Sequence, residues 1–238
     1  MEQFKDVNRR KSKPKEKLNI AMFGQKRIPS REGGVEIVVE ELCTRMVAQG
    51  HNVTCYNRGG HHVSGSEYDS KRLKEYKGIK LKTVPTIEKK GLAAVSSSFF
   101  AALCCAFGKY DVVHIHAEGP AFFAWLPKMF GKKVIVTIHG LDWQREKWKG
   151  GFGSKFIHQG EKNAVKYADE IIVKYTYETI TTPATTVLVS YSVDASGKIR
   201  VDVHYHGVQG LPELPVFGMR FIMPTLADKY LYKGCLLY

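Results

Sequence analysis

Residues 18–24 read LNIAMFG, and residues 25–34 continue as QKRIPSREGG. A short apolar run that ends in glycine is typical of a buried parallel strand. After the loop, residues 35–49 place apolar side chains at a 3.6-residue period, and Gly50 closes the pattern as a helix would. Strand, glycine-containing loop and helix together predict the first βα unit of a doubly wound domain.

The same alternation continues through the next hundred residues. It predicts further strands at 52–56, 79–84, 111–117, 132–140 and 168–173. It predicts helices at 91–108 and 154–168. Residues 91–108 carry no charge, but they include three consecutive serines and are barely long enough to span a bilayer, so a buried helix is the better interpretation. The sequence therefore predicts an α/β fold, with a Rossmann-like parallel sheet covered by helices on both faces.

The pattern changes after Val173. Residues 185–193 and 198–206 alternate polar with apolar or aromatic side chains about a turn at 194–197, which predicts a short antiparallel β segment. Three prolines in residues 211–224 suit a sheet edge. We expect a basic lead-in at 1–17, an α/β domain at 18–173 and a β segment at 174–238 that is too small to bury a core alone.

Composition narrows the class of protein. The 238 residues are 44% hydrophobic and 25% charged, which excludes a disordered or fibrous chain. The net charge of +13 favours a phosphorylated ligand or an anionic membrane surface as partner. Five scattered cysteines without a C-x-x-C pair indicate free thiols in the cytoplasm and no structural metal site.

Candidate site residues follow the strands, because ligands of open parallel sheets bind beyond the carboxyl ends of their strands. Gly33 and Gly34 directly precede a helix, where backbone N–H groups can approach a phosphate. The alternative is a tight turn without a ligand. The loop is not G-x-G-x-x-G, which disfavours dinucleotide binding and a dehydrogenase.

Two further strand ends carry polar side chains. His116 ends one strand and is followed by Glu118, although a strand histidine can equally be a buried structural group. We expect His114 and His116 to point to opposite faces of this strand, so that only His116 serves a site. His139, Gly140 and Asp142 end the next strand, with a helix N-cap at Asp142 as the alternative.

Residues 18–173 resemble the N-terminal, acceptor-side domain of family 4 glycosyltransferases of the GT-B type. The resemblance is carried by LNIAMFG, PSREGGVE, DVVHIHAEGP, VIVTIHGLDW and EKNAVKYADEIIV, in the family's order. It implies sugar transfer with retention from a nucleotide-sugar donor to a lipid- or polysaccharide-linked acceptor, with no bound cofactor or metal and no nucleic-acid partner. It also implies a cytoplasmic protein, peripheral at the inner face of the membrane.

The resemblance assigns roles to the candidate residues. It places the donor diphosphate near Gly33 and Gly34, and it makes His116 the catalytic residue that faces the transferred sugar. His139 and Gly140 would bind the donor and line the cleft, with Glu118 and Asp142 nearby.

Residues 181–234 instead resemble the start of the C-terminal small-chain β-sandwich domain of large β-galactosidases, through the hairpin and LPELPVFGMRF. The catalytic glutamates of that family lie in a barrel domain, so none is carried over. We interpret the chain as a chimera joined between residues 173 and 181, which lacks the donor-binding domain and is inactive alone. The alternative functions are a noncatalytic carbohydrate- or membrane-binding module and a β-galactosidase-derived fragment.

Overall fold

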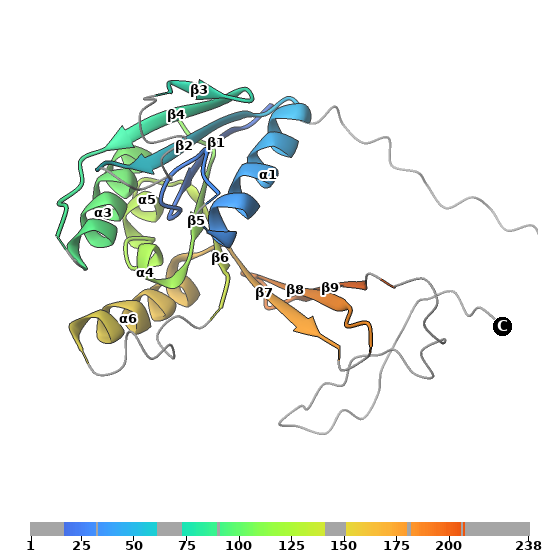
Figure 1. Cartoon of the computed structure of the whole chain (residues 1–238). Helices are drawn as coiled ribbons and strands as arrows, with labels where there is room; N and C mark the ends of the chain where they lie inside the picture. The colour runs from blue at the N-terminus through green and yellow to red at the C-terminus, as the bar shows by residue number, and fades with distance from the viewer. Residues whose placement is uncertain are drawn as a thin grey trace, which may run out of the picture.

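The strands of the described residues form one nine-stranded sheet (Figure 1). The computed structural model describes residues 17–31, 33–60, 73–89, 91–140, 151–179 and 182–205, together with Gly207. Its strands lie in the order β3-β4-β2-β1-β5-β6-β7-β8-β9. Their bounds are β1 Asn19–Phe23, β2 Asn52–Arg58, β3 Glu75–Tyr76, β4 Ile79–Val84, β5 Val112–His116, β6 Lys133–Ile138, β7 Glu170–Glu178, β8 Thr186–Asp194 and β9 Ile199–Tyr205.

The six central strands, from β4 to β7, are parallel to one another. The chain builds outward from β1 to β2 and β4 on one side, then returns to build β5, β6 and β7 on the other. The order therefore reverses between β1 and β5, and the carboxyl ends of these two strands form the topological switch point, where sheets of this kind bind ligands.

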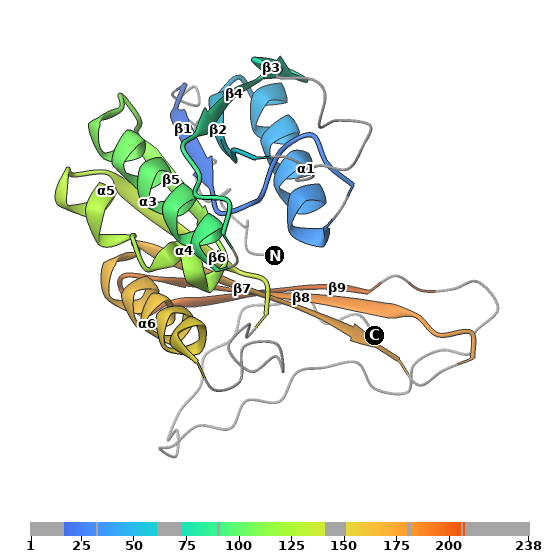
Figure 2. The same ribbon diagram turned by 60° about the vertical axis from the view of Figure 1, so that its left-hand side comes forward.

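Helices cover the two faces unequally (Figures 1 and 2). Of the described helices, only α1 (Gly34–Ala48) packs on one face, where Val39 and Cys43 meet Ile20, Met22 and Val53. The opposite face carries α3 (Leu92–Phe107), α4 (Glu118–Ala121), α5 (Trp125–Met129) and α6 (Phe152–Tyr167). The larger core lies there, between these helices and inward side chains of β1, β5 and β6.

The uncharged stretch at 91–108 is the buried helix that the sequence predicts. Ser96, Ser97 and Ser98 are buried, and the hydroxyls of Ser96 and Ser97 donate hydrogen bonds to carbonyls one turn earlier. This local bonding lets a helix with three serines pack against the apolar core. Within the described residues, none of the helices has the length and apolarity needed to cross a bilayer.

The antiparallel segment extends the same sheet. The strand β7 pairs in parallel with β6 through its first residues, Glu170 to Val173, and antiparallel with β8 along its whole length. It therefore passes through Val173, the first residue of the expected join, without a break. We call β7, β8 and β9 the ribbon; their far ends extend beyond the helices (Figure 2).

The two faces of the ribbon differ. Side chains that continue the face of the larger core are apolar or aromatic: Ile171, Val173, Tyr175, Tyr177, Val187, Val189, Tyr191, Val193, Ile199, Val201, Val203 and Tyr205. The other face carries mostly charged and hydroxyl side chains, including Lys174, Ser190 and Asp202. The sequence predicts this alternation and the hairpin correctly, but it misses β3 and ends β7 five residues too early.

Candidate functional site

The carboxyl ends of β1 and β5 meet at Gly24 and His116. The backbone of Gly24 has φ +113°, and a Cβ built on it would collide with the carbonyl oxygen of His116. Glycine is thus required here both by conformation and by the close approach of the two strands. This contact brings the start of the glycine-containing loop to the strand end that bears His116.

Three imidazoles stack on the face opposite the larger core. The ring of His116 lies 4.3 Å from that of His114 and 5.4 Å from that of His139, centroid to centroid. The expectation that His114 and His116 point to opposite faces is wrong, because residues two apart in a strand share a face. His139 is paired with His116, whose Nδ1 is 3.1 Å from Nε2 of His139.

Burial keeps the inner two rings neutral. His116 is fully buried, and burial, followed by the charges of His114 and His139, holds its pKa well below the usual value. Burial likewise lowers the pKa of His114 to about 3, and the nearby Lys174 ammonium acts in the same direction. A neutral imidazole has one nitrogen that donates and one that accepts. With Nδ1 paired, Nε2 of His116 has no hydrogen-bond partner among the described residues.

The turn after β5 is strained. Ala117 has φ +76°, a left-handed conformation that non-glycine residues rarely adopt. Such strain clusters at functional sites. The next residue, Glu118, starts α4 and is completely buried. Gly140, two residues beyond the end of β6, has φ +149°. The remaining predicted site residue, Asp142, lies outside the described residues.

Gly33 and Gly34 lie at the start of α1. Nothing is found within 4 Å of where a side chain at Gly34 would begin, whereas at Gly33 the near atoms belong to the carboxylate of Glu36. That carboxylate also accepts a hydrogen bond from the backbone N–H of Lys26, 2.8 Å away, and so fixes the loop. The N-cap Gly33 makes no side-chain cap, and backbone N–H groups in the first turn of a helix attract anions.

The structure thus brings His116 into contact with His139 and Gly24. Gly33 and Gly34 lie at the start of α1, with free space beside Gly34. Sequence reasoning placed His114 outside the site, and it missed Thr137 and Lys174 around the stack. Nε2 of His114 lies 2.7 Å from Oγ1 of Thr137, and the charge of Lys174 acts on both buried imidazoles. The sequence did carry a signal for His114 and Thr137. Each lies two residues before a predicted site histidine, His116 or His139, and residues two apart in a strand share a face. Among the described residues, no group of three or more His, Cys, Asp or Glu side chains could hold a metal ion.

Two protein-family models match the chain. Residues 32–174 match the model of glycosyltransferase family 4, and residues 136–235 match that of the β-galactosidase small chain. The two matches overlap over residues 136–174, which include the end of β6, all of α6 and the start of β7.

Two curated relatives match parts of the chain. The β-galactosidase small subunit of Latilactobacillus sakei is 66% identical over 67 residues, which are 28% of this chain and 21% of that protein. A β-galactosidase of Clostridium acetobutylicum is 42% identical over 82 residues, which are 34% of this chain and 9% of that protein. The chain thus spans only a minor part of either relative.

A solved structure matches the architecture. The sucrose-phosphate synthase of Thermosynechococcus elongatus superposes with a TM-score of 0.50 at 17% identity, over 64% of this chain and 41% of that one. At this identity the likeness concerns the fold, a Rossmann-like α/β half. Since the family 4 match spans more than half of the 238 residues, the chain belongs to glycosyltransferase family 4, and its C-terminal part is similar to the β-galactosidase small chain.

Proposed function

We propose that residues 18–173 form the acceptor-side half of a retaining glycosyltransferase, which moves a sugar from a nucleotide-sugar donor to a lipid- or polysaccharide-linked glycan. The observation that carries the proposal is His116 at the switch point, fully buried, with Nδ1 paired to His139 and Nε2 unpartnered. A buried polar nitrogen without a partner is costly, and a sugar hydroxyl there would satisfy it. His116 is the proposed catalytic residue.

The donor diphosphate is proposed to bind at Gly33 and Gly34. The open space at Gly34 and the uncapped first turn of α1 suit a phosphate group. Glu36 lies against Gly33, so the phosphate would approach from the side of Gly34. His139 and Gly140 would bind the donor and line the cleft, and Glu118 and Asp142 would complete it.

A GT-B site is assembled between two Rossmann-like domains, and residues 18–173 supply one of them. Residues 186–205 form antiparallel strands of the same sheet. The parallel pairing of β7 with β6 ends at Val173, and beyond it only antiparallel pairing continues. At this change of pairing we propose a domain boundary at 173–174, and we expect residues 18–173 by themselves to bind donor and acceptor without appreciable turnover, because most transition-state contacts need both halves.

Proton NMR of the imidazole C–H signals tests the proposal. Uridine- and guanosine-diphosphate sugars should shift the signals of His116 and His139, assigned with His116→Gln and His139→Gln. Gly34→Val should weaken this binding at least about tenfold, because its side chain fills the space next to the first turn.

Gly151→Val is the matched control, since Gly151 also precedes a helix and has nothing within 4 Å of its built Cβ. Equal loss in both variants, or no imidazole shift with any nucleotide sugar, would contradict the proposed donor site.

A second candidate function is contact with an anionic membrane surface. Phe107, Met129 and Phe130 are 69%, 72% and 45% exposed, and the rings of Phe107 and Phe130 lie 4.7 Å apart. The exposed Lys109 and Lys133 lie near them in the chain. Apolar side chains flanked by lysines suit the surface of an anionic leaflet. Salt-sensitive binding to phosphatidylserine vesicles, lost in Phe107→Ser/Phe130→Ser but kept in His116→Gln, is the expected result.

A further inference from the structure

The stack of three imidazoles ends beside a cation, Lys174 of β7. Thr137 of β6 is paired with Ile172 of β7, and His139 and Lys174 each follow two residues later. Residues two apart in a strand share a face, so the side chains of His139 and Lys174 lie on the same face of the sheet. Thr137 contacts His114, which makes this the face of the stack. The charge of Lys174 accordingly helps to lower the pKa of both buried imidazoles.

A hydroxyl group lies on the other side of Lys174. The strands β7 and β8 are antiparallel, and Lys174 is directly opposite Ser190. Such pairs have Cβ atoms about 4.5–5.5 Å apart, and their side chains point to the same face. Lys174 is thus flanked by the imidazole of His139 on one side and by the hydroxyl of Ser190 on the other. Three polar side chains from neighbouring strands lie side by side where the parallel sheet passes into the ribbon.

The ammonium group of Lys174 has no hydrogen-bond or ion-pair partner among the described residues. Partial burial of this group lowers the pKa of Lys174, and none of the described carboxylates raises it. The residue still has an exposed surface, so a ligand can reach it from solvent. A partly buried charge without a counter-ion costs free energy, and an anion that binds to it recovers that cost.

Two carboxylates on this face of the ribbon act on Arg200 instead. Asp202, which is paired with Ser190, accepts hydrogen bonds from the guanidinium at 2.8 and 3.0 Å. The hydrogen bond and the charge of Asp202, followed by the charge of Glu170, raise the pKa of Arg200. These carboxylates therefore do not neutralise Lys174.

An oxyanion suits these groups better than a neutral hydroxyl. The ammonium group of Lys174 has three N–H donors and no acceptor, and the hydroxyl of Ser190 can donate as well. A carboxylate or phosphate oxygen accepts from both and carries the opposite charge. Hydrogen bonds between ionised groups are shorter and stronger than those between neutral groups. The two side chains therefore favour an anionic group on a ligand.

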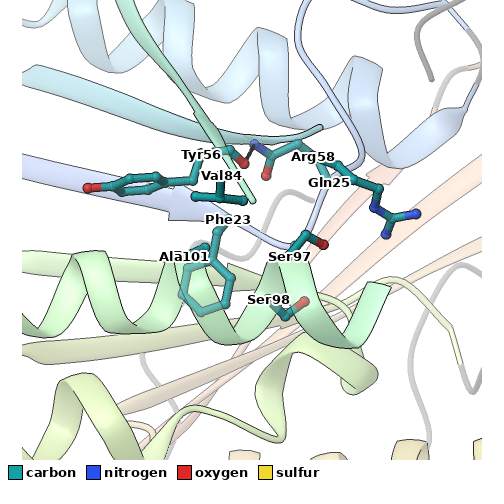
Figure 3. A pocket seen from close by; sticks show the side chains of 9 residues that line it. Phe23, Gln25, Tyr56, Arg58, Val84, Ser97, Ser98 and Ala101 are labelled. Carbon is teal, nitrogen blue, oxygen red and sulfur yellow. Dashed lines mark hydrogen bonds between the residues drawn. The ribbon is translucent and has the colours of Figure 1, made fainter. Parts of the chain in front are cut away.

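A hollow beneath α3, on the opposite face of the sheet, is too small for such a ligand (Figure 3). Its lining includes Tyr56, Arg58 and Ser98, together with Phe23 and Val84 of the larger core. It encloses about 10 Å³, which is room for about one water. A substrate group is therefore expected on the face of the stack.

We propose that Lys174 and Ser190 bind an oxyanion group, a carboxylate or a phosphate, of a sugar substrate whose reacting ring lies at His116. The strands β5 and β7 are two strand spacings apart, about 10 Å, which one sugar ring and a lysine side chain span together. The ribbon thereby adds substrate specificity to the half-site formed by residues 18–173. That a sugar carries the oxyanion rests on the proposed glycosyltransferase function, whereas the anion site itself does not.

The direct probe is the ε-methylene signal of Lys174 in carbon–proton NMR spectra of the full chain, assigned by its loss in Lys174→Met. At constant ionic strength, glucuronate or glucose 6-phosphate should shift this signal in a saturable way, and glucose should not. The affinity for the anionic sugar, measured by calorimetry, should fall at least about tenfold in Lys174→Met, because a hydrogen bond to a charged group is lost. It should fall about threefold to tenfold in Ser190→Ala and remain within about threefold in Lys174→Arg.

A matched control separates local binding from net charge. Lys198→Met removes the same charge from the turn between β8 and β9 and should bind the anionic sugars normally. Because the ammonium group of Lys174 has no partner among the described residues, Lys174→Met should not lower the urea midpoint of unfolding. A lower midpoint would contradict the unpaired state of Lys174.

The outcomes separate this site from the proposed donor site. Binding of glucuronate alone, or of glucose 6-phosphate alone, supports the site and identifies the oxyanion. Equal shifts with neutral glucose, or an equal loss in Lys198→Met, would overturn the proposal. Oxyanion binding without any imidazole shift by nucleotide sugars would leave the Lys174 site standing and contradict only the donor site. A Lys174 signal that responds to none of the three sugars would overturn the oxyanion site, whatever the imidazole signals do.

Discussion

The central parallel strands and the ribbon belong to one sheet, yet they are stabilised differently. In β1, β2, β5 and β6 most side chains on both faces are buried, whereas β7 to β9 are half-buried or exposed along most of their length. Of the ribbon residues, only Val189 is a buried hydrophobic residue. Backbone hydrogen bonds can therefore continue a sheet into a region that buries little apolar surface. Most of the free energy of unfolding comes from the apolar side chains that helices bury.

The largest expected effect is a cavity in the helix-covered part. Phe23 is 1% exposed in the larger core, and Phe23→Ala should lower the free energy of unfolding by about 3–5 kcal/mol. In the ribbon, Ile199 is 62% exposed, and Ile199→Ala should change it by no more than about 0.5 kcal/mol. Urea unfolding curves of the two variants measure the contrast, and equal losses would mean that the ribbon is packed as tightly as the core.

Two glycines with positive φ, one in the helix-covered part and one in the ribbon, allow the same comparison for the backbone. Gly24→Ala should destabilise the protein by about 3 kcal/mol, since it combines left-handed strain with a collision against the backbone of His116. Gly197, in the ribbon turn, has φ +80° with nothing within 4 Å, so Gly197→Ala should cost about 1 kcal/mol. Thermal unfolding monitored by circular dichroism gives both values; a larger loss at Gly197 would contradict the prediction.

Acid should lower the stability of the protein through the imidazole stack. The pKa of His114 is about 3 in the folded protein, against 6.5 in a free side chain. Between these two pH values the unfolded chain binds a proton at His114 that the folded chain does not. The contribution of neutral His114 to the free energy of unfolding is therefore fully present above pH 6.5. It falls by about 1.4 kcal/mol per pH unit as the pH drops below 6.5. In His114→Gln the slope of the urea-derived free energy against pH should decrease by that amount, and an unchanged slope would exclude His114 as its source.

The smallest effect compares neighbours within β8. Val189 is 6% exposed and Leu188 is 43% exposed, because adjacent residues of a strand point to opposite faces. Val189→Ala should cost about 1 kcal/mol, and Leu188→Ala about 0.5 kcal/mol or less. If chemical unfolding shows the reverse order, the apolar face of the ribbon is not the packed one.

Sequence reasoning succeeded where a periodic pattern persists. The apolar run of β1, the 3.6-residue period of α1 and the alternation of β8 and β9 each predicted the element within about two residues. It failed where the outcome depends on neighbours in space. The two-residue strand β3 exists only through its pairing with β4, and β7 continues past Val173 because β8 lies alongside it.

The candidate site shows the same division. The positions of His116, His139 and Gly33 after strands could be inferred from the chain alone. The stacking of His114 on His116 and the unpartnered Nε2 of His116 could not be inferred, because both depend on which side chains meet across several strands.

The double pairing of β7 has a consequence for the order of folding. Its contacts with β8 join residues close in sequence, whereas β1 and β5 must bring Ile20 to Val112 across most of the domain. Loop closure makes short-range pairing faster, so the β7–β8 and β8–β9 hairpins should form before the parallel sheet closes. The least buried part of the protein would then be the earliest to form, and its free β7 edge would be ready when β6 arrives.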